Sequence, residues 1–190
     1  FLICAALMLC AGSSEIAMAQ WASTFAEKSL GVSKFTGDLL GPCLFAVLMG
    51  SGRVLFGYFG DRLNIRRVLT FSAALCIASY LITTVIPVPM VSLIGCGLCG
   101  LSASTMWPGI FSLAAKHYPN GGTAMFAMLA MFGDFGCAFG PWITGILSDF
   151  AAADNGITMD PLKFGLIFCV TFPAVMILLL NCTKAMRKVK

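Results

Sequence analysis

The sequence is poor in charged residues and contains a single histidine, and both shortages narrow what the protein can be. Only 11% of its 190 residues are Asp, Glu, Lys or Arg. A soluble domain carries about 25% charged residues, so this chain has too few to cover a surface that faces water. The hydrophobic fraction is 59%, and mean hydropathy is +0.93. These values favour lipid as the medium in which the chain folds.

The apolar residues form six long runs. A helix needs about 20 mainly apolar residues to cross a bilayer. The breaks between the runs are rich in Gly, Pro, Asn, Asp and charge, which is typical of turns. Barrel strands alternate apolar with polar residues, and none of the runs does so. The sequence predicts an all-α integral membrane six-helix bundle, a single domain over 1–190 with spans at about 1–25, 39–59, 68–85, 88–115, 123–147 and 162–182.

A signal peptide is the alternative for the first run, because Ala17-Met18-Ala19 is similar to a cleavage site. However, the run lacks a basic leader and an initiating Met, and further spans follow it. We therefore interpret it as the first span of a piece cut from a longer chain.

The basic residues of the breaks predict an orientation. Cytoplasmic loops of membrane proteins carry an excess of Lys and Arg. Placing the N-terminus in the cytoplasm puts eight basic residues inside and three outside, so we expect a multi-pass protein of the cytoplasmic membrane with both termini cytoplasmic. The net charge of +4 reflects this anchoring and requires no nucleic-acid partner. The inside set is Arg62, Arg66, Arg67, Lys116, Lys184, Arg187, Lys188 and Lys190, and the outside set is Lys28, Lys34 and Lys163.

Little in the sequence favours an enzyme or a metal site. Nearly all of the nine cysteines lie within spans, where buried Cys packs as a small hydrophobe. Cys96 and Cys99 have the spacing of a redox motif but not its soluble context. An intramembrane enzyme needs a nucleophile and a base, or metal ligands, that face one another. His117 lies in a turn, so we expect no catalysis, no disulfide, no metal and no cofactor.

Three ionisable residues lie inside spans, where charge is costly: Glu15, Arg53 and Asp134. By the helical rise of about 1.5 Å per residue, both carboxylates lie about 15 Å from a span end, and Arg53 about 12 Å. One interpretation is a structural ion pair between Arg53 and one carboxylate. The other is a water-filled path in which at least one carboxylate binds substrate or a coupling proton, because intramembrane ionisable residues are functional candidates by default.

Glycine and proline within the spans predict close packing and kinks. Small residues such as Gly133 and Gly140 let helix backbones approach closely. Pro141 and Pro108 each remove a helical hydrogen bond, so we expect kinks in the fifth and fourth spans. Trp107, next to Pro108, lies deep enough to face a cavity and joins the candidate pathway residues.

The break from Gly57 to Leu69 resembles the signature loop of the major facilitator superfamily, Gly-x-Leu-x-Asp-Arg-x-Gly-Arg-Arg/Lys-x-x-Leu. The matching residues are Gly57, Asp61, Arg62, Arg66 and Leu69, with Arg67 adjacent, and the departures are Phe59, Asn64 and Ile65. Such loosening is typical of the copy in the second half of these proteins. The segments "GDFGCAFGPWITG" and "PGIFSLAAKHYPNGGTAMFAM" are similar to the eleventh helix and to the region from the tenth helix into the next.

The resemblance implies the C-terminal six-helix half of a twelve-helix transporter, built from inverted three-helix repeats, here 1–85 and 88–182. The first span looks most like bacterial sugar-permease-type members. In this family, Asp61 and the arginines would form a cytoplasmic charge cluster that latches one conformation. Anchoring of the topology alone is the alternative for these residues.

Two functions follow from these features. The first is a secondary active transporter that moves a small solute, sugar-like or an organic anion, by alternating access coupled to H⁺ or Na⁺. Its partners would be the solute, membrane lipid and the missing N-terminal half. The second is a non-transporting membrane assembly module, because faces of small residues serve assembly equally well.

Overall fold

The chain folds entirely into helices and short turns over the part that the structure covers. The computed structural model describes the backbone of residues 1–153 and 157–188, and their side chains except 61 and 183–188. No strand occurs in these ranges. The helices are α1 (Leu2–Lys28), α2 (Lys34–Asp38), η1 (Leu39–Cys43), α3 (Leu44–Phe59), η2 (Gly60–Arg62), α4 (Ile65–Val85), α5 (Pro89–Ala103), α6 (Met106–His117), α7 (Gly122–Ala152), α8 (Pro161–Phe168) and α9 (Thr171–Lys188).

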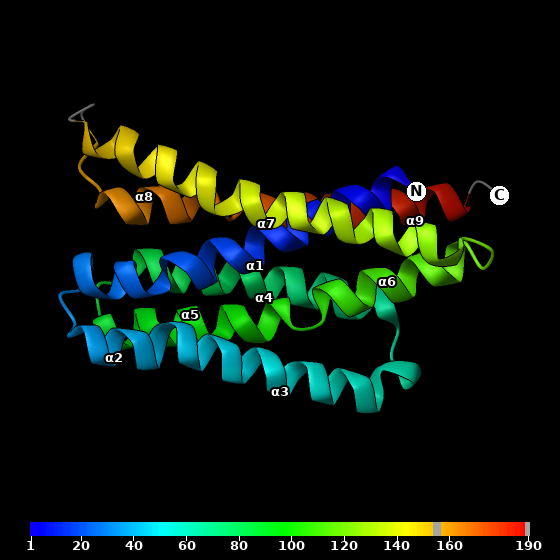
Figure 1. Ribbon diagram of the computed structural model, residues 1–190, viewed down its shortest axis with the longest axis horizontal. Coiled ribbons are helices and arrows are strands. Elements are labelled where there is room, and N and C mark those ends of the chain that lie inside the picture. The colour runs from blue at the N-terminus through cyan, green and yellow to red at the C-terminus, as the bar shows by residue number, and fades with distance from the viewer. Residues whose placement is uncertain (154–156, 189–190) are drawn as a thin grey trace.

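Within the described ranges, six helical stretches are long and apolar enough to cross a membrane. They run back and forth, so Phe1 and the C-terminal part of α9 lie at the same end of the bundle (Figure 1). We call this the N-terminal end and the opposite one, where α1 turns into α2, the far end. The predicted fold class, an all-α bundle of six membrane helices, is confirmed. The stretches are Leu2–Lys28, Lys34–Phe59, Ile65–Val85, Pro89–His117, Gly122–Ala152 and Pro161–Cys182.

Turn chemistry explains where two of the helices begin. Gly31 has a φ of 64°, a left-handed conformation that glycine adopts without strain, and it lets α1 reverse into α2. Asn64 caps α4, because its side chain accepts a hydrogen bond from the backbone N–H of Arg67 at 3.3 Å. The turn between α3 and α4 is therefore tight, and it presents Arg62, Arg66 and Arg67 at the N-terminal end.

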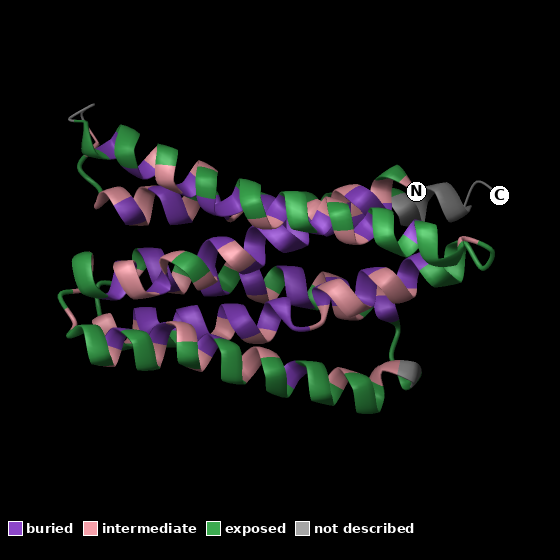
Figure 2. Cartoon of the chain, viewed as in Figure 1, coloured by how far each residue is buried: buried purple, intermediate pink, exposed green. Residues whose placement is uncertain are grey.

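Helix α1 lies at the centre of the bundle, whereas two other spans are largely uncovered (Figure 2). In the apolar centre of each span, 67% of the residues are buried in α1, 17% in the span of α2, η1 and α3, and 22% in α7. Close backbone approach fixes α7 against α1: a Cβ added to Gly136 would lie 2.1 Å from the carbonyl oxygen of Leu9, and one added to Gly140 would lie 2.4 Å from that of Ser13.

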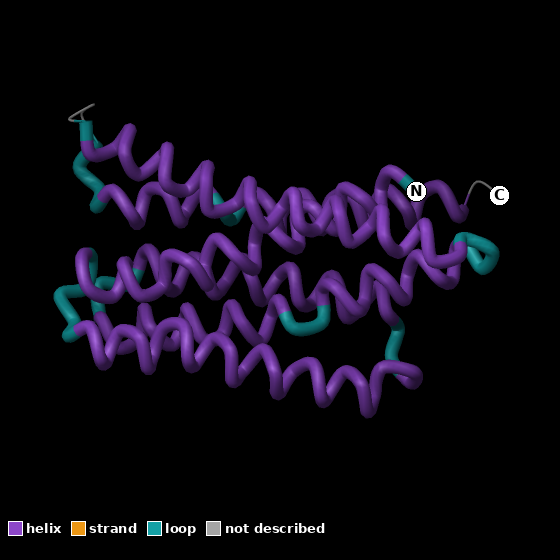
Figure 3. The backbone as a smooth tube through the Cα atoms, in the orientation of Figure 1, coloured by secondary structure: helices purple, strands orange, loops and turns teal. Residues whose placement is uncertain are grey.

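The two prolines predicted to kink helices behave differently. The fourth span is broken at Ser104 and Thr105, in the middle of the bundle, and this separates α5 from α6 (Figure 3). Pro108 explains the position of the break, because it has no N–H to donate to the carbonyl of Ser104. Helix α7, in contrast, runs on through Pro141 without a break. The indole Nε1 of Trp21 donates to the carbonyl of Pro141 at 3.1 Å, which ties α1 to α7 at this point.

Candidate functional site

A charge pair joins the central helix to an outer one. Glu15 of α1 is buried, with 7% of its surface exposed. One guanidinium nitrogen of Arg53, on α3, donates to Glu15 Oε1 at 3.3 Å. The Arg53 side chain is 47% exposed. The contact is therefore long and made through one atom on each side, and Arg53 keeps nitrogen atoms available for another acceptor.

Two buried polar atoms near this pair have no hydrogen-bond partner among the described residues. They are Glu15 Oε2 and the indole Nε1 of Trp107. Leaving a buried polar atom unsatisfied costs about 1–3 kcal/mol. Native proteins keep few such atoms, and each one calls for a partner such as a water, an ion or a ligand. The site therefore has unused hydrogen-bonding capacity on both α1 and α6.

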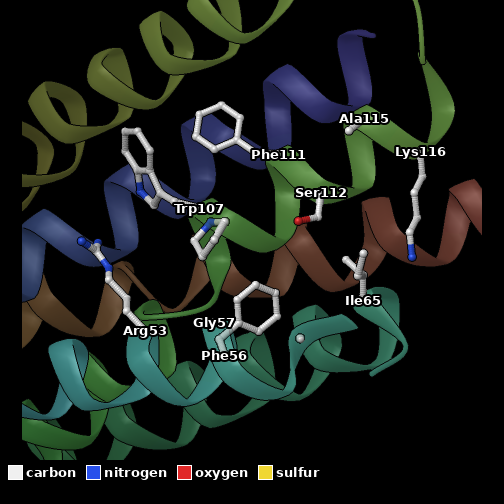
Figure 4. A pocket seen from close by; sticks show the side chains of 11 residues that line it. Arg53, Phe56, Gly57, Ile65, Trp107, Phe111, Ser112, Ala115 and Lys116 are labelled. Atoms are coloured by element: carbon white, nitrogen blue, oxygen red, sulfur yellow. The ribbon is translucent and has the colours of Figure 1, made fainter. Parts of the chain in front are cut away.

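A cavity of about 760 Å³ opens between α3, the start of α4 and α6, and Arg53 and Trp107 both line it (Figure 4). Its size is in the range of small-molecule sites, which are about 300–1,000 Å³. Arg53 and Lys116 give it positive charge, and no acidic side chain among the described residues lines it. Aromatic and apolar side chains form much of the wall: Phe56, Ile65, Trp107, Pro108 and Phe111.

The ring of Trp107 rests on a glycine of the neighbouring helix. A Cβ added to Gly133 on α7 would lie 2.5 Å from the Trp107 ring. On its other side, Trp107 meets Phe111 edge-on, with ring centroids 6.4 Å apart. The structure thus brings together Trp107, Pro108 and Gly133, three residues that the sequence singled out for separate reasons. Gly140 and Pro141 lie elsewhere, on the side of α7 that packs against Ser13 and Trp21.

Asp134 does not take part in the charge pair. Its side chain is exposed on α7, and no basic side chain among the described residues forms an ion pair with it. The sequence left open which carboxylate pairs with Arg53, and the structure selects Glu15.

The residues of the predicted signature loop lie at the N-terminal end. Gly57 lines the cavity described above. Arg62 and Arg67 are exposed, and Arg66 is half-buried. The side chain of Asp61, like those of Lys184, Arg187 and Lys188, lies outside the described part, so the charge cluster predicted for Asp61 stays a prediction.

Sequence reasoning missed Lys116, which it assigned only to anchoring the topology. Lys116 lines the cavity that holds Arg53 and also a second cavity, of about 1,290 Å³, which Arg66 and Arg67 line. The available signal for its place in the cavity was a lysine in the last turn of the fourth span, shortly after Phe111 and Ser112. The cysteines of the described residues are free, and no three His, Cys, Asp or Glu side chains there come together as a metal site.

These features define a multi-pass membrane protein that holds a charge pair and a cavity within its spans. Residues 1–141 match the Major Facilitator Superfamily. The chain therefore belongs to this family, whose members are secondary transporters and not enzymes, as the signature loop predicted. Comparisons with curated proteins and with solved structures each give no match.

Proposed function

We propose that the chain is the C-terminal six-helix half of a transporter that moves a small solute across the cytoplasmic membrane by alternating access. The loosened signature loop supports assignment to the second half. The N-terminal end of the bundle holds the signature loop with its arginines and both ends of the described chain. Because cytoplasmic loops carry an excess of Lys and Arg, this supports cytoplasmic termini. The two three-helix repeats, 1–85 and 88–182, remain part of this proposal.

The uncovered faces of α3 and α7 support a missing half. Monomeric proteins rarely leave large apolar patches without a partner or lipid. Both helices flank the cavity region, so a second set of six helices placed against them would close the cavity into a central pathway. The exposed apolar side chains are Val47, Val54, Leu55, Tyr58 and Phe59 on α3, and Phe126, Met128, Met131, Phe135, Phe139, Trp142, Ile146 and Phe150 on α7.

Of the two solute classes that the sequence left open, the cavity favours an organic anion with an apolar body over a sugar. Arg53 and Lys116 supply positive charge, and the lining residues that the structure describes contain no carboxylate. The aromatic wall suits the apolar part of such a solute. A sugar site would be expected to carry several neutral and acidic hydrogen-bonding side chains, whereas among the described lining residues Ser112 alone is of that kind.

The observation that carries the proposal is the single contact between Glu15 and Arg53. When Glu15 is ionised, it competes with an anionic solute for the guanidinium. A proton on Glu15 would remove the negative charge that competes for the guanidinium, and this would release Arg53 to the solute. Proton and anion would then bind together and move together. A proton fits better than Na⁺, because Na⁺ needs several oxygen ligands and Glu15 has one unpaired oxygen.

Uptake into vesicles that contain the full-length protein tests the coupling. We expect Glu15→Gln to abolish accumulation driven by an imposed pH gradient, because a neutral amide cannot carry the proton. Solute exchange without a gradient should persist, because Arg53 is then permanently available. Glu27→Gln is the matched control, since it makes the same change at an exposed position of the same helix. Unchanged gradient-driven uptake in Glu15→Gln, or uptake that follows only an imposed Na⁺ gradient, would refute proton coupling at Glu15.

The alternative is a non-transporting assembly module, which the same exposed faces of α3 and α7 would serve. The upstream coding sequence separates the two proposals. Six further spans with a second Gly-x-x-x-Asp-Arg loop would support the transporter. Stable self-association of the purified protein through α3 and α7, without vesicle uptake of any tested anion, would support the module.

A further inference from the structure

The second cavity, which we call the groove, lies at the N-terminal end between α4, α6 and α9. It shares Lys116 with the first cavity, but Glu15 and Arg53 do not line it. We propose that this groove binds an anionic phospholipid, with the phosphate of the headgroup on Arg66, Arg67 and Lys116 and an acyl chain along α4. This inference goes beyond the proposed function and does not depend on it. Residues from all three helices line the groove: Asn64, Ile65, Arg66, Arg67, Thr70, Phe71, Ala74, Leu113, Lys116, His117 and Asn181.

The mouth of the groove concentrates positive charge from two helices. Arg66 and Arg67 come from the first turn of α4, and Lys116 comes from the last turn of α6, about fifty positions later in the chain. Among the side chains that the structure describes, no acidic one lines the groove and none forms an ion pair with these three. Cations gathered without a counter-charge favour binding of an anion. The planar guanidinium of arginine matches the oxygens of a phosphate in particular.

The groove becomes apolar with depth, and this favours a lipid over a free phosphate ion. From Asn64 to Ala74, α4 rises by about 15 Å, from the basic turn into the span. At this depth the lining residues on α4 are Phe71, which is 69% exposed, and Ala74, which is also exposed. A soluble anion would fill only the basic mouth. A phospholipid would place its phosphate at the mouth and one chain over Phe71 and Ala74.

The position of the groove also suits a lipid of the adjacent leaflet. Basic residues near a membrane surface attract anionic lipids, and basic pockets between membrane helices bind their headgroups. The groove opens beside α4 and α9, which form the third and sixth spans. Asn181 of α9 adds a neutral hydrogen-bonding side chain opposite the arginines. The lipid would therefore bridge α4 and α9 at their shared end.

Native mass spectrometry of the full-length protein from mixed micelles of phosphatidylglycerol and phosphatidylcholine tests this proposal. We expect the wild type to retain phosphatidylglycerol preferentially. Each basic residue near the surface contributes about fivefold, so Arg66→Gln with Arg67→Gln should lower that preference about 20- to 30-fold. Lys28→Gln with Lys34→Gln, which removes two charges at the far end, is the matched control and should leave the preference unchanged. Equal preference in both double variants would overturn the proposal.

A second variant tests the apolar part of the groove independently of the charges. Ala74→Trp places a large ring in the apolar part of the groove. Because Ala74 is exposed, the fold should tolerate the change. We expect this variant to lose retained phosphatidylglycerol as well. Competition with inorganic phosphate and with glycerol 3-phosphate identifies the source of the phosphate group. If either displaces the lipid at equal concentration, or if Ala74→Trp retains lipid as the wild type does, the groove is an anion site and the lipid assignment is wrong.

Discussion

Helices α1 and α3 are both apolar spans, yet their surroundings are opposite. Helix α1 packs against α5, α6, α7 and α9 and is covered along its length, whereas α3 packs mainly on α5 and leaves most of its surface open (Figures 1 and 2). Glu15 on α1 is buried, and its partner Arg53 on α3 is half exposed. Apolar composition therefore marks both helices as parts of spans, but the coverage of each shows which one lies in the core and which one lies at the edge of the bundle.

The largest loss of stability should come from adding one methyl group at a glycine of α7 that packs against α1. Gly136→Ala on α7 would place a Cβ 2.1 Å from the backbone of Leu9 on α1. Neither backbone can yield locally, so we expect the free energy of unfolding to fall by about 3 kcal/mol. Thermal unfolding in detergent, followed by circular dichroism, measures this change.

The matched control is Gly50→Ala on α3, because a Cβ there would meet nothing within 4 Å. Alanine is the better helix former by about 1 kcal/mol. We therefore expect this variant to be unchanged or slightly more stable. Equal destabilisation by the two substitutions would mean that α3 is covered in the protein as closely as α1.

An intermediate effect should come from removing the charge that links the two helices. Arg53→Gln leaves the Glu15 carboxylate buried without its cation. We expect a loss of about 1–3 kcal/mol, because a buried polar group then lacks its partner. Glu15→Gln combined with Arg53→Gln should recover most of this loss. A double-mutant cycle of thermal unfolding at neutral pH measures the coupling, and additive effects would show that the 3.3 Å contact contributes nothing.

The smallest effect should come from deleting one hydroxyl group. Tyr80 on α4 is fully buried, and its hydroxyl donates to the carbonyl of Ser14 on α1 at 2.8 Å. Tyr80→Phe should cost about 1 kcal/mol. Tyr58→Phe on α3 makes the same change at a side chain that is 81% exposed, and it should have no measurable effect. Chemical unfolding of both variants in the same detergent makes the comparison, and a larger loss for Tyr58→Phe would reverse our assignment of core and edge.

The fold class was predictable from the sequence because lipid imposes one requirement on every span. Long apolar runs interrupted by turn residues can only be membrane helices, and the signature loop pointed to the family that the match to residues 1–141 then established. The first turn of α4 was likewise readable, because Asn64 is a strong cap.

The candidate site was only partly predictable, because helix rotation decides which side chains meet. Helix α1 is apolar on all sides, so periodicity could not show that Glu15 faces α3 and that Asp134 on α7 does not. The contact between Trp107 and Gly133 joins residues on different spans, and nothing local to either predicts it. Lys116 lines the cavity because α6 begins as a separate helix after the break. In the sequence, only Pro108 indicated this break.

Two side-chain hydrogen bonds lie at the break between α5 and α6. The hydroxyl of Ser104 donates to the carbonyl of Leu101 at 2.6 Å, and Thr105 exchanges a hydrogen bond with Ser72 of α4 at 2.5 Å. The Ser104 hydroxyl thus gives a partner to one main-chain carbonyl beside the break, and an unsatisfied main-chain group in hydrocarbon costs several kcal/mol. The fourth span thus consists of two helical segments, and the one that carries Trp107 and Lys116 begins after the break.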